Sequence, residues 1–215
     1  MQELPERIDG APSRVRVLVV VEGTHDIKFL RRISALLHSA HPALPDLAAM
    51  ERNRELIFLP ISGHPQAWIR RLSPLNLPEF HLYDREQSPV TEQRLETVDR
   101  INQRSRCRGM LTQKRSLENY LHPHSIQVIT DVPLEFDDHA CVATLAAQQV
   151  FESSHGKSAW QRLTRRAQVR LTNRAKHWLN TSAVEEMTVP LLQERDPDGE
   201  IISWLETIRQ LAETA

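Results

Sequence analysis

Short apolar runs recur along the first half of the chain, with more polar stretches between them. Residues 15–21 (VRVLVVV) form the longest run, and shorter ones follow at residues 55–59, 79–83 and 109–112. Short runs that are rich in Val, Ile, Leu and Phe are typical of strands buried in a parallel sheet. The pattern therefore predicts a buried strand at each of these places.

The stretches between the runs have the periodicity of helices. In residues 24–38, apolar side chains recur on one helix face, and Thr24 is suited to cap the beginning of that helix. A short helix ending at Leu72 and a longer one over residues 89–104 follow, whereas residues 41–54 predict a loose connection. This alternation predicts an α/β fold with a mainly parallel sheet of about four strands, flanked by helices.

After residue 130 the pattern changes to helices only. The predicted helices cover residues 139–152, residues 158–179, a segment that begins at Ser182 with Glu185 in a capping box, and a last segment from Asp198 to Ala212. We therefore expect a core over residues 14–130 and a helical extension over residues 131–215 that packs on it.

Composition limits the class of protein. The chain has 215 residues, of which 40% are hydrophobic and 26% charged, with a formal net charge of -1, and these values are typical of a folded globular chain. Its longest strongly apolar run is far shorter than the roughly 20 residues of a membrane helix, and its acidic, polar beginning differs from a signal peptide. Cys107 and Cys141 are too widely spaced for a zinc cage or a disulfide framework. We expect a cytoplasmic protein that does not enter membranes.

The near-neutral total hides an uneven distribution of charge. Residues 100–115 hold six basic residues and residues 157–176 hold seven, with no acid in either block, whereas acids dominate from Glu185 onward. The arginines that we predict to contact nucleic acid come from these two blocks: Arg115, Arg162, Arg166, Arg170 and Arg174. On one helix the last four would repel each other, so they need an anionic partner. Nucleic-acid phosphate and the acidic C-terminal helices are both suited to that role.

Carboxylates follow two of the predicted strands. Glu22 comes directly after the first strand and Asp84 directly after the third, and Asp26 and Glu86 lie close behind them. Ligands of parallel sheets bind beyond the carboxyl ends of the strands, so we expect these side chains at one edge of the sheet. Several carboxylates at one edge are costly unless a cation lies among them, and oxygen ligands of this kind suit Mg²⁺. The arrangement predicts metal-assisted phosphodiester chemistry.

Three segments resemble a known family. Residues 20–30 (VVEGTHDIKFL) resemble the first motif of TOPRIM domains, and residues 82–86 (LYDRE) resemble the second motif, normally Asp-x-Asp. Residues 115–121 (RSLENYL) resemble a segment of the OLD-like nuclease branch, in which the Glu joins the metal site. The resemblance covers roughly residues 15–125 and implies a TOPRIM fold, which is Rossmann-like.

The resemblance also implies roles for single residues. Glu22 would be a metal ligand and the general base, and the other ligands of one or two Mg²⁺ or Mn²⁺ ions would be Asp26, Asp84, Glu86 and Glu118. Glu86 departs from the family pattern by one methylene, so it would reach a metal either directly or through water. OLD-like nucleases also use a lysine that stabilises charge on the phosphate. Lys176 and Lys157 are the candidates here, and we favour Lys176.

The expected function is therefore that of a nuclease without an attached ATPase, because the chain has no GxxxxGK[ST] motif. DNA is the expected substrate. A separate ATPase of the ABC or SMC type as partner, and a role in phage defence or DNA repair, follow from the family alone. Two alternatives stay open, namely cleavage of structured RNA and a non-catalytic binding or regulatory module. The sequence does not indicate an oligomeric state.

Overall fold

The computed structural model describes residues 15–61 and 65–214. Its centre is a sheet of four strands, β1 (Val17–Val21), β2 (Leu56–Pro60), β3 (Glu79–Tyr83) and β4 (Cys107–Leu111), in the order β2-β1-β3-β4. All three neighbouring pairs are parallel. This confirms the predicted fold class. The fourth strand begins at Cys107 and not at Gly109.

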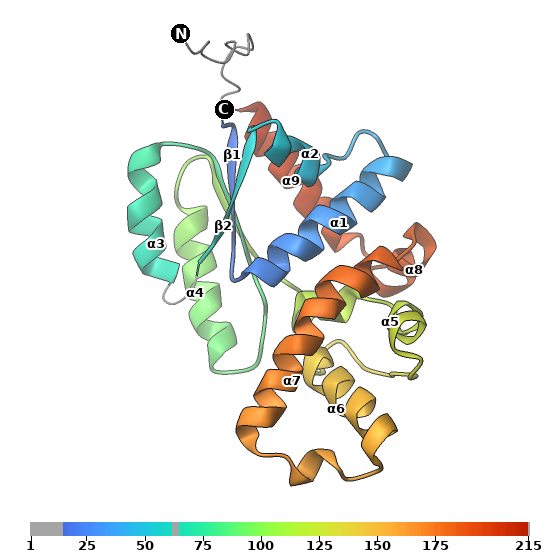
Figure 1. The fold of residues 1–215 in the computed structure, drawn as a ribbon. Coiled ribbons are helices and arrows are strands. Elements are labelled where there is room, and N and C mark those ends of the chain that lie inside the picture. Colours follow the sequence, from blue (N-terminus) through green and yellow to red (C-terminus); the bar gives the residue numbers. More distant parts are fainter. Residues whose placement is uncertain (1–14, 62–64, 215) are drawn as a thin grey trace, which may run out of the picture.

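Helices cover both faces of the sheet (Figure 1). Helices α3 (Pro65–Leu72) and α4 (Val90–Asn102) lie on one face, and α1 (Thr24–Ala40) and α9 (Glu200–Glu213) lie on the other. Because side chains alternate along a strand, β1 serves both layers. Its odd-numbered valines pack with α1 and α9, whereas Leu18 and Val20 pack under α4. The strand is therefore buried on both sides, which explains its unbroken apolar run.

The connection predicted over residues 41–54 contains a short helix, α2 (Leu47–Arg52). Asp46 caps it, because one carboxylate oxygen accepts hydrogen bonds from the backbone N–H groups of Ala48 and Ala49. Leu47 is fully buried, and Glu51 forms an ion pair with Arg31 at 2.6 Å. The expectation of a loose segment was wrong because the cap and one buried leucine suffice to order six residues.

The second half of the chain holds α5 (Pro123–Thr130), α6 (Val142–His155), α7 (Arg165–Trp178) and α8 (Val189–Arg195). Helices α6 and α7 lie side by side and extend away from the sheet (Figure 1). The helix predicted over residues 158–179 is interrupted, because Leu163 is extended and Thr164 caps a new helix. Only a 3₁₀ turn, Trp160–Arg162, precedes that break.

Helix α7 continues into a π turn, Leu179–Ala183, so the helix predicted to begin at Ser182 is not found. The next helix, α8, begins later and is capped by Thr188. At the start of α9 the capping carboxylate is that of Asp196 and not Asp198, because Asp196 accepts hydrogen bonds from the N–H groups of Glu200 and Ile201. Gly199 adopts the left-handed backbone that this turn requires.

Helix α9 belongs to the segment that we expected to be an extension, yet it packs against β1 and β3. Its buried side chains Ile201, Trp204, Leu205 and Ile208 share one apolar cluster with Val17 and Phe80 of the strands. The boundary at residue 130 stays a prediction, but the end of the chain supplies part of the core. No helix within the described residues is long and apolar enough to cross a membrane.

Candidate metal centre

The acidic site lies where β1 and β3 end side by side. Glu22 follows β1 and Asp84 follows β3, and the backbone N–H of Asp84 donates to Glu22 Oε1 at 3.0 Å. Asp84 Oδ1 in turn accepts a hydrogen bond of 3.2 Å from the N–H of Leu117. Asp84 is 8% exposed. The parallel pairing of the two strands therefore brings together carboxylates that are 62 residues apart in sequence.

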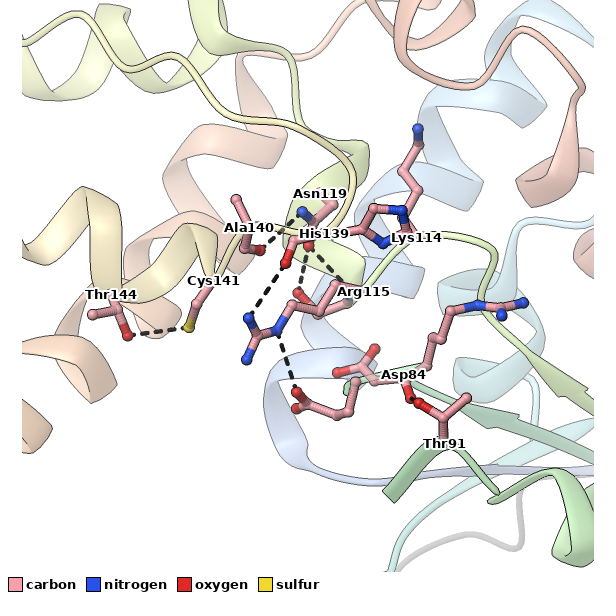
Figure 2. Close-up of polar contacts among 12 residues, drawn as sticks. Asp84, Thr91, Lys114, Arg115, Asn119, His139, Ala140, Cys141 and Thr144 are labelled. Carbon is pink, nitrogen blue, oxygen red and sulfur yellow. Dashed lines mark hydrogen bonds and ion pairs between the residues drawn. The ribbon is translucent and has the colours of Figure 1, made fainter. Parts of the chain in front are cut away.

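Two further carboxylates reach the same edge. Asp26, in the first turn of α1, accepts a hydrogen bond of 2.8 Å from the N–H of Gly23. Glu118 lies in a 3₁₀ turn, Leu117–Tyr120, and is 3% exposed. Asn119 anchors this turn by donating to the carbonyls of Asp137 and Ala140 (Figure 2).

Helix α7 brings a cation to these acids. The charge of the Glu118 carboxylate raises the pKa of Lys176, and the charges of Asp84 and Asp26 raise it further. Burial of Lys176 acts in the opposite direction and lowers this pKa. Asn180, in the π turn, donates to Glu118 Oε1 at 2.8 Å and to the carbonyl of Lys176 at 2.8 Å. The π turn thus links the end of α7 directly to the acidic edge.

The carboxylates together carry more negative charge than the surroundings balance. Burial raises the pKa of Asp26 to about 7, with Glu118 and Glu22 adding to the effect. Burial, followed by the charge of Asp26, raises the pKa of Asp84 well above its ordinary value. The pKa of Glu22 is also raised by burial, although Arg94 opposes this. An added cation would relieve this repulsion.

The donor set fits a hard divalent cation. All four acids, Glu22, Asp26, Asp84 and Glu118, offer oxygen ligands of the kind that Mg²⁺ and Mn²⁺ prefer. Asn180 Oδ1, beside Glu118, is buried without a hydrogen-bond partner. In the part of the chain that the structure describes, no group of three or more His, Cys, Asp or Glu side chains is arranged so that it could hold a metal ion as it stands. A bound ion would therefore complete its shell with water and substrate phosphate, as Mg²⁺ usually does.

Arg94, on α4, belongs to the site but was missed from the sequence. Its guanidinium binds Glu22 Oε2 at 2.7 Å and also donates to the carbonyl oxygen of Asp84. Its side chain is only 16% exposed. One arginine thus ties the ends of β1 and β3 together. No motif marks this residue, because its place depends on how α4 crosses the edge of the sheet.

Glu86 and Arg115 pair with each other. Arg115 Nε lies 3.4 Å from Glu86 Oε2, and the Arg115 guanidinium donates to the carbonyl of His139 at 3.3 Å (Figure 2). Glu86 has a left-handed backbone with φ 55°, which is uncommon for a residue other than glycine. Arg115 therefore lies in an internal contact beside the site and not on an open surface. The Glu86 carboxylate still raises the pKa of Lys176 and of Glu22.

The two candidate lysines lie in different places. Lys176 is largely buried among the acids, whereas Lys157 is exposed after the end of α6. None of the shifted acids of the site is influenced by Lys157. The structure therefore brings Lys176, and not Lys157, to the acidic edge.

Not all of the four arginines that we predicted on one helix belong to the same helix. Arg166, Arg170 and Arg174 belong to α7, and Arg162 lies in the preceding 3₁₀ turn. All four are exposed. None of them forms an ion pair with an acid of residues 15–61 or 65–214. The acidic C-terminal helices thus do not neutralise these arginines.

Two solved structures share this fold over nearly their whole length. The C-terminal region of the OLD protein of Xanthomonas campestris pv. campestris is 13% identical with a TM-score of 0.55, and the match covers 93% of this chain and 95% of that one. The C-terminal region of the Burkholderia pseudomallei OLD protein is 14% identical with a TM-score of 0.56, over 92% and 98% of the two chains. No protein-family model and no curated protein matches the sequence. At these identities the likeness is one of fold, and the chain has the fold of OLD C-terminal regions.

Proposed function

We propose that this chain is a Mg²⁺- or Mn²⁺-dependent nuclease that hydrolyses phosphodiester bonds, with DNA as the first substrate to test. The proposal rests on one observation above all, which is that the end of α7 meets the acids of the sheet edge, where Asn180 donates to Glu118 Oε1 and to the carbonyl of Lys176. The charges of Glu118, Asp84 and Asp26 raise the pKa of half-buried Lys176. A cation near excess carboxylates suits a site that binds metal ions and phosphate together. The shared fold with OLD C-terminal regions supports it.

The acids would hold one or two ions. Glu22, Asp26, Asp84 and Glu118 would be direct ligands, and Glu86 would act directly or through water after leaving Arg115. Bound ions would supply Lewis acidity and lower the pKa of the attacking water.

Lys176 and Glu22 would carry out the remaining chemistry. The ammonium of Lys176 would neutralise the charge that develops on the scissile phosphate. Glu22 is held in one orientation by the Asp84 N–H and by Arg94. Burial raises the pKa of Glu22 above its ordinary value, which would make its carboxylate a stronger general base toward water.

Cleavage assays on plasmid DNA and on total tRNA, with Mg²⁺ or Mn²⁺, test the proposal. We expect metal-dependent cleavage by the wild type and none by Glu22→Gln, with an unchanged melting temperature. Glu96→Gln is the matched control, because Glu96 lies on the exposed side of α4, 3.7 Å from Arg100, and its loss should leave cleavage unchanged.

The assay also separates the alternatives. Cleavage confined to tRNA would move the substrate class to structured RNA. Binding of nucleic acid without cleavage by the wild type, in either metal, would reject the nuclease and favour a non-catalytic binding module. Equal cleavage by the wild type and Glu22→Gln would reject Glu22 as ligand and base.

A partner ATPase and a role in phage defence or DNA repair are proposals that rest on the family resemblance. The solved structures of this fold are described as regions of OLD proteins, which agrees with a module that acts beside another unit. A change in cleavage rate on adding a candidate ATPase with ATP, compared with ATP alone, would test this.

A further inference from the structure

One face of α7 presents a row of exposed polar and basic side chains. With about 100° of rotation per residue, Arg166, Arg170, Asn173 and His177 fall within an arc of roughly 60°, and all four are exposed. Thr164, Ala167 and Val169 join Arg166, Arg170 and Asn173 in lining a shallow cavity of about 550 Å³ along this side of the helix. The row is therefore part of a concave surface.

This row ends at the acidic edge. His177 Nδ1 lies 3.3 Å from Lys28 Nζ, so Lys28 of α1 donates to the end of α7. The ring of His177 lies edge-on to that of His25, with centroids 6.0 Å apart. His25 Nδ1 is buried without a hydrogen-bond partner. The pKa of Lys176, the residue before His177, is raised by the charges of Glu118, Asp84 and Asp26, so this lysine lies near the acids.

In the first basic block, residues 100–115, acidic side chains neutralise several of the basic ones. Arg104 pairs with Glu79, Lys114 with Asp138, and Arg100 with Glu96. No ion pair within the described residues involves Arg166 or Arg170. Like charges four residues apart repel, so an anion from outside would stabilise this face of α7.

We infer that Arg166, Arg170, Asn173, His177 and Lys28 form a track that binds the phosphates of one nucleic-acid strand and leads it to Lys176. The inference rests on the proposed function, because it takes nucleic acid as the substrate. From Arg166 to His177 the helix rises by about 16 Å, and one DNA strand carries a phosphate about every 3.4 Å along its axis. The track therefore spans roughly five phosphates.

Of the four arginines that we predicted on one helix, two lie off this track. Arg162 belongs to the turn before α7. Arg174 is rotated by about 80° from Arg166 and lines a different cavity, of about 580 Å³, with Trp178 and Phe151 of the α6–α7 pair. These residues provide a matched control, because they have the same charge, similar exposure and nearly the same position in sequence.

The test is binding of a labelled oligonucleotide, measured by fluorescence anisotropy in EDTA, so that cleavage plays no part. Arg166→Glu with Arg170→Glu is compared with Arg162→Glu with Arg174→Glu. We expect the on-track pair to weaken binding about tenfold or more near 0.1 M salt and to reduce the slope of log K against log [salt] by about two, since each phosphate contact contributes nearly one. The off-track pair should change affinity less than about threefold.

Lys28→Gln tests the end of the track, with Lys157→Gln as its control. Lys28→Gln should lower the salt slope by somewhat less than one unit, and Lys157→Gln should leave it unchanged. Equal effects of the on-track and off-track pairs, or no binding by the wild type, would overturn the track. Strong on-track effects together with an absence of cleavage would keep the track and reject the nuclease, so the two proposals fail separately.

Discussion

Buried carboxylates lie at both ends of strand β3, and the two groups differ in how their charge is balanced. At the beginning, Arg104 donates two hydrogen bonds to Glu79, of 2.8 and 2.7 Å, and His81 Nε2 lies 2.8 Å from the same carboxylate. Burial alone would raise the pKa of Glu79, but the bonds from His81 and Arg104 lower it below its ordinary value. At the other end, burial and neighbouring acids raise the pKa of Asp84.

The difference distinguishes a carboxylate whose charge is balanced within the fold from the acids that we propose to be functional. Glu79 has all the partners that a buried carboxylate needs, so nothing further is required of its surroundings. The acids around Asp84 have Lys176 near them and the ion pair of Arg94 with Glu22, yet the pKa values of Glu22, Asp26 and Asp84 are still raised, so we expect them to bind a further cation. Glu79 and Asp84 are both buried, and they differ in whether neighbouring positive charge balances their own.

The largest expected effect is on cleavage by Lys176→Met. Removing the cation that faces the phosphate should lower the cleavage rate by about 10²–10³-fold, the typical cost of one charge-stabilising group in an active site. Single-turnover cleavage with saturating metal measures it. Lys157→Met is the control and should cleave at the wild-type rate, and a normal rate for Lys176→Met would remove this lysine from the chemistry.

Next in size is the loss of stability in Arg104→Met. This change leaves buried Glu79 without its guanidinium partner and with only the hydrogen bond to His81, which should lower the free energy of unfolding by about 3 kcal/mol. Urea unfolding measures it. Arg100→Met is the control, because Arg100 is 53% exposed in a pair with Glu96, and its loss should cost less than about 0.5 kcal/mol. If Arg104→Met lowered the free energy of unfolding as little as Arg100→Met, the charge of Glu79 would not depend on Arg104, and the contrast with Asp84 would fail.

In contrast to Arg104→Met, the substitution Asp84→Asn is expected to raise the free energy of unfolding. Removing one of several repelling carboxylates, while Asn Oδ1 still accepts from the Leu117 N–H, should raise the free energy of unfolding in EDTA by about 1 kcal/mol near pH 8. Cleavage should be lost in the same variant. Urea unfolding with and without Mg²⁺ gives the measurement, and a destabilised variant in EDTA would contradict the picture of excess charge.

A smaller effect concerns pH and His81. Burial lowers the pKa of His81 below its ordinary value of 6.5. As the pH falls below about 6.5, the unfolded chain takes up a proton that folded His81 resists, so the folded state loses stability. His81→Gln should remove up to about 1 kcal/mol of this loss between pH 6.5 and 5.5. Unfolding curves at the two pH values, with His38→Gln as a control, test it, and an identical acid dependence in both variants would assign the effect elsewhere.

The sequence predicts those parts of the site that depend on local order. Glu22 and Asp84 follow buried strands, and the parallel sheet itself then places them at one edge. Asp26 follows from the helix turn after Glu22. Glu118 follows from the resemblance of its segment to the OLD-like branch. Strand and turn geometry is therefore enough to place Glu22, Asp26 and Asp84 at the edge, whereas Glu118 was expected only from the resemblance.

Other parts depend on packing that no short segment encodes. Arg94 reaches Glu22 only because α4 crosses the sheet edge, and Asn180 reaches Glu118 only because the end of α7 widens into a π turn. The break at Leu163 was missed because the apolar periodicity continues through it. Tertiary structure likewise decides that Lys176, and not Lys157, lies near the acids, whereas the catalytic role of either lysine stays a prediction.

The packing of α9 on β1 and β3 has a consequence for how the protein is made. A chain leaves the ribosome from its N-terminus at about 5–20 residues per second, so the acids of the sheet edge emerge well before Lys176. The sheet still lacks one covering helix when Lys176 is made, because residues 200–213 follow it in the chain. The strands can therefore gain their complete core only after Lys176 has been synthesised. A nascent chain that carries every carboxylate of the site still lacks the helix that packs on β1 and β3, so we expect the site to become rigid only once α9 has been made.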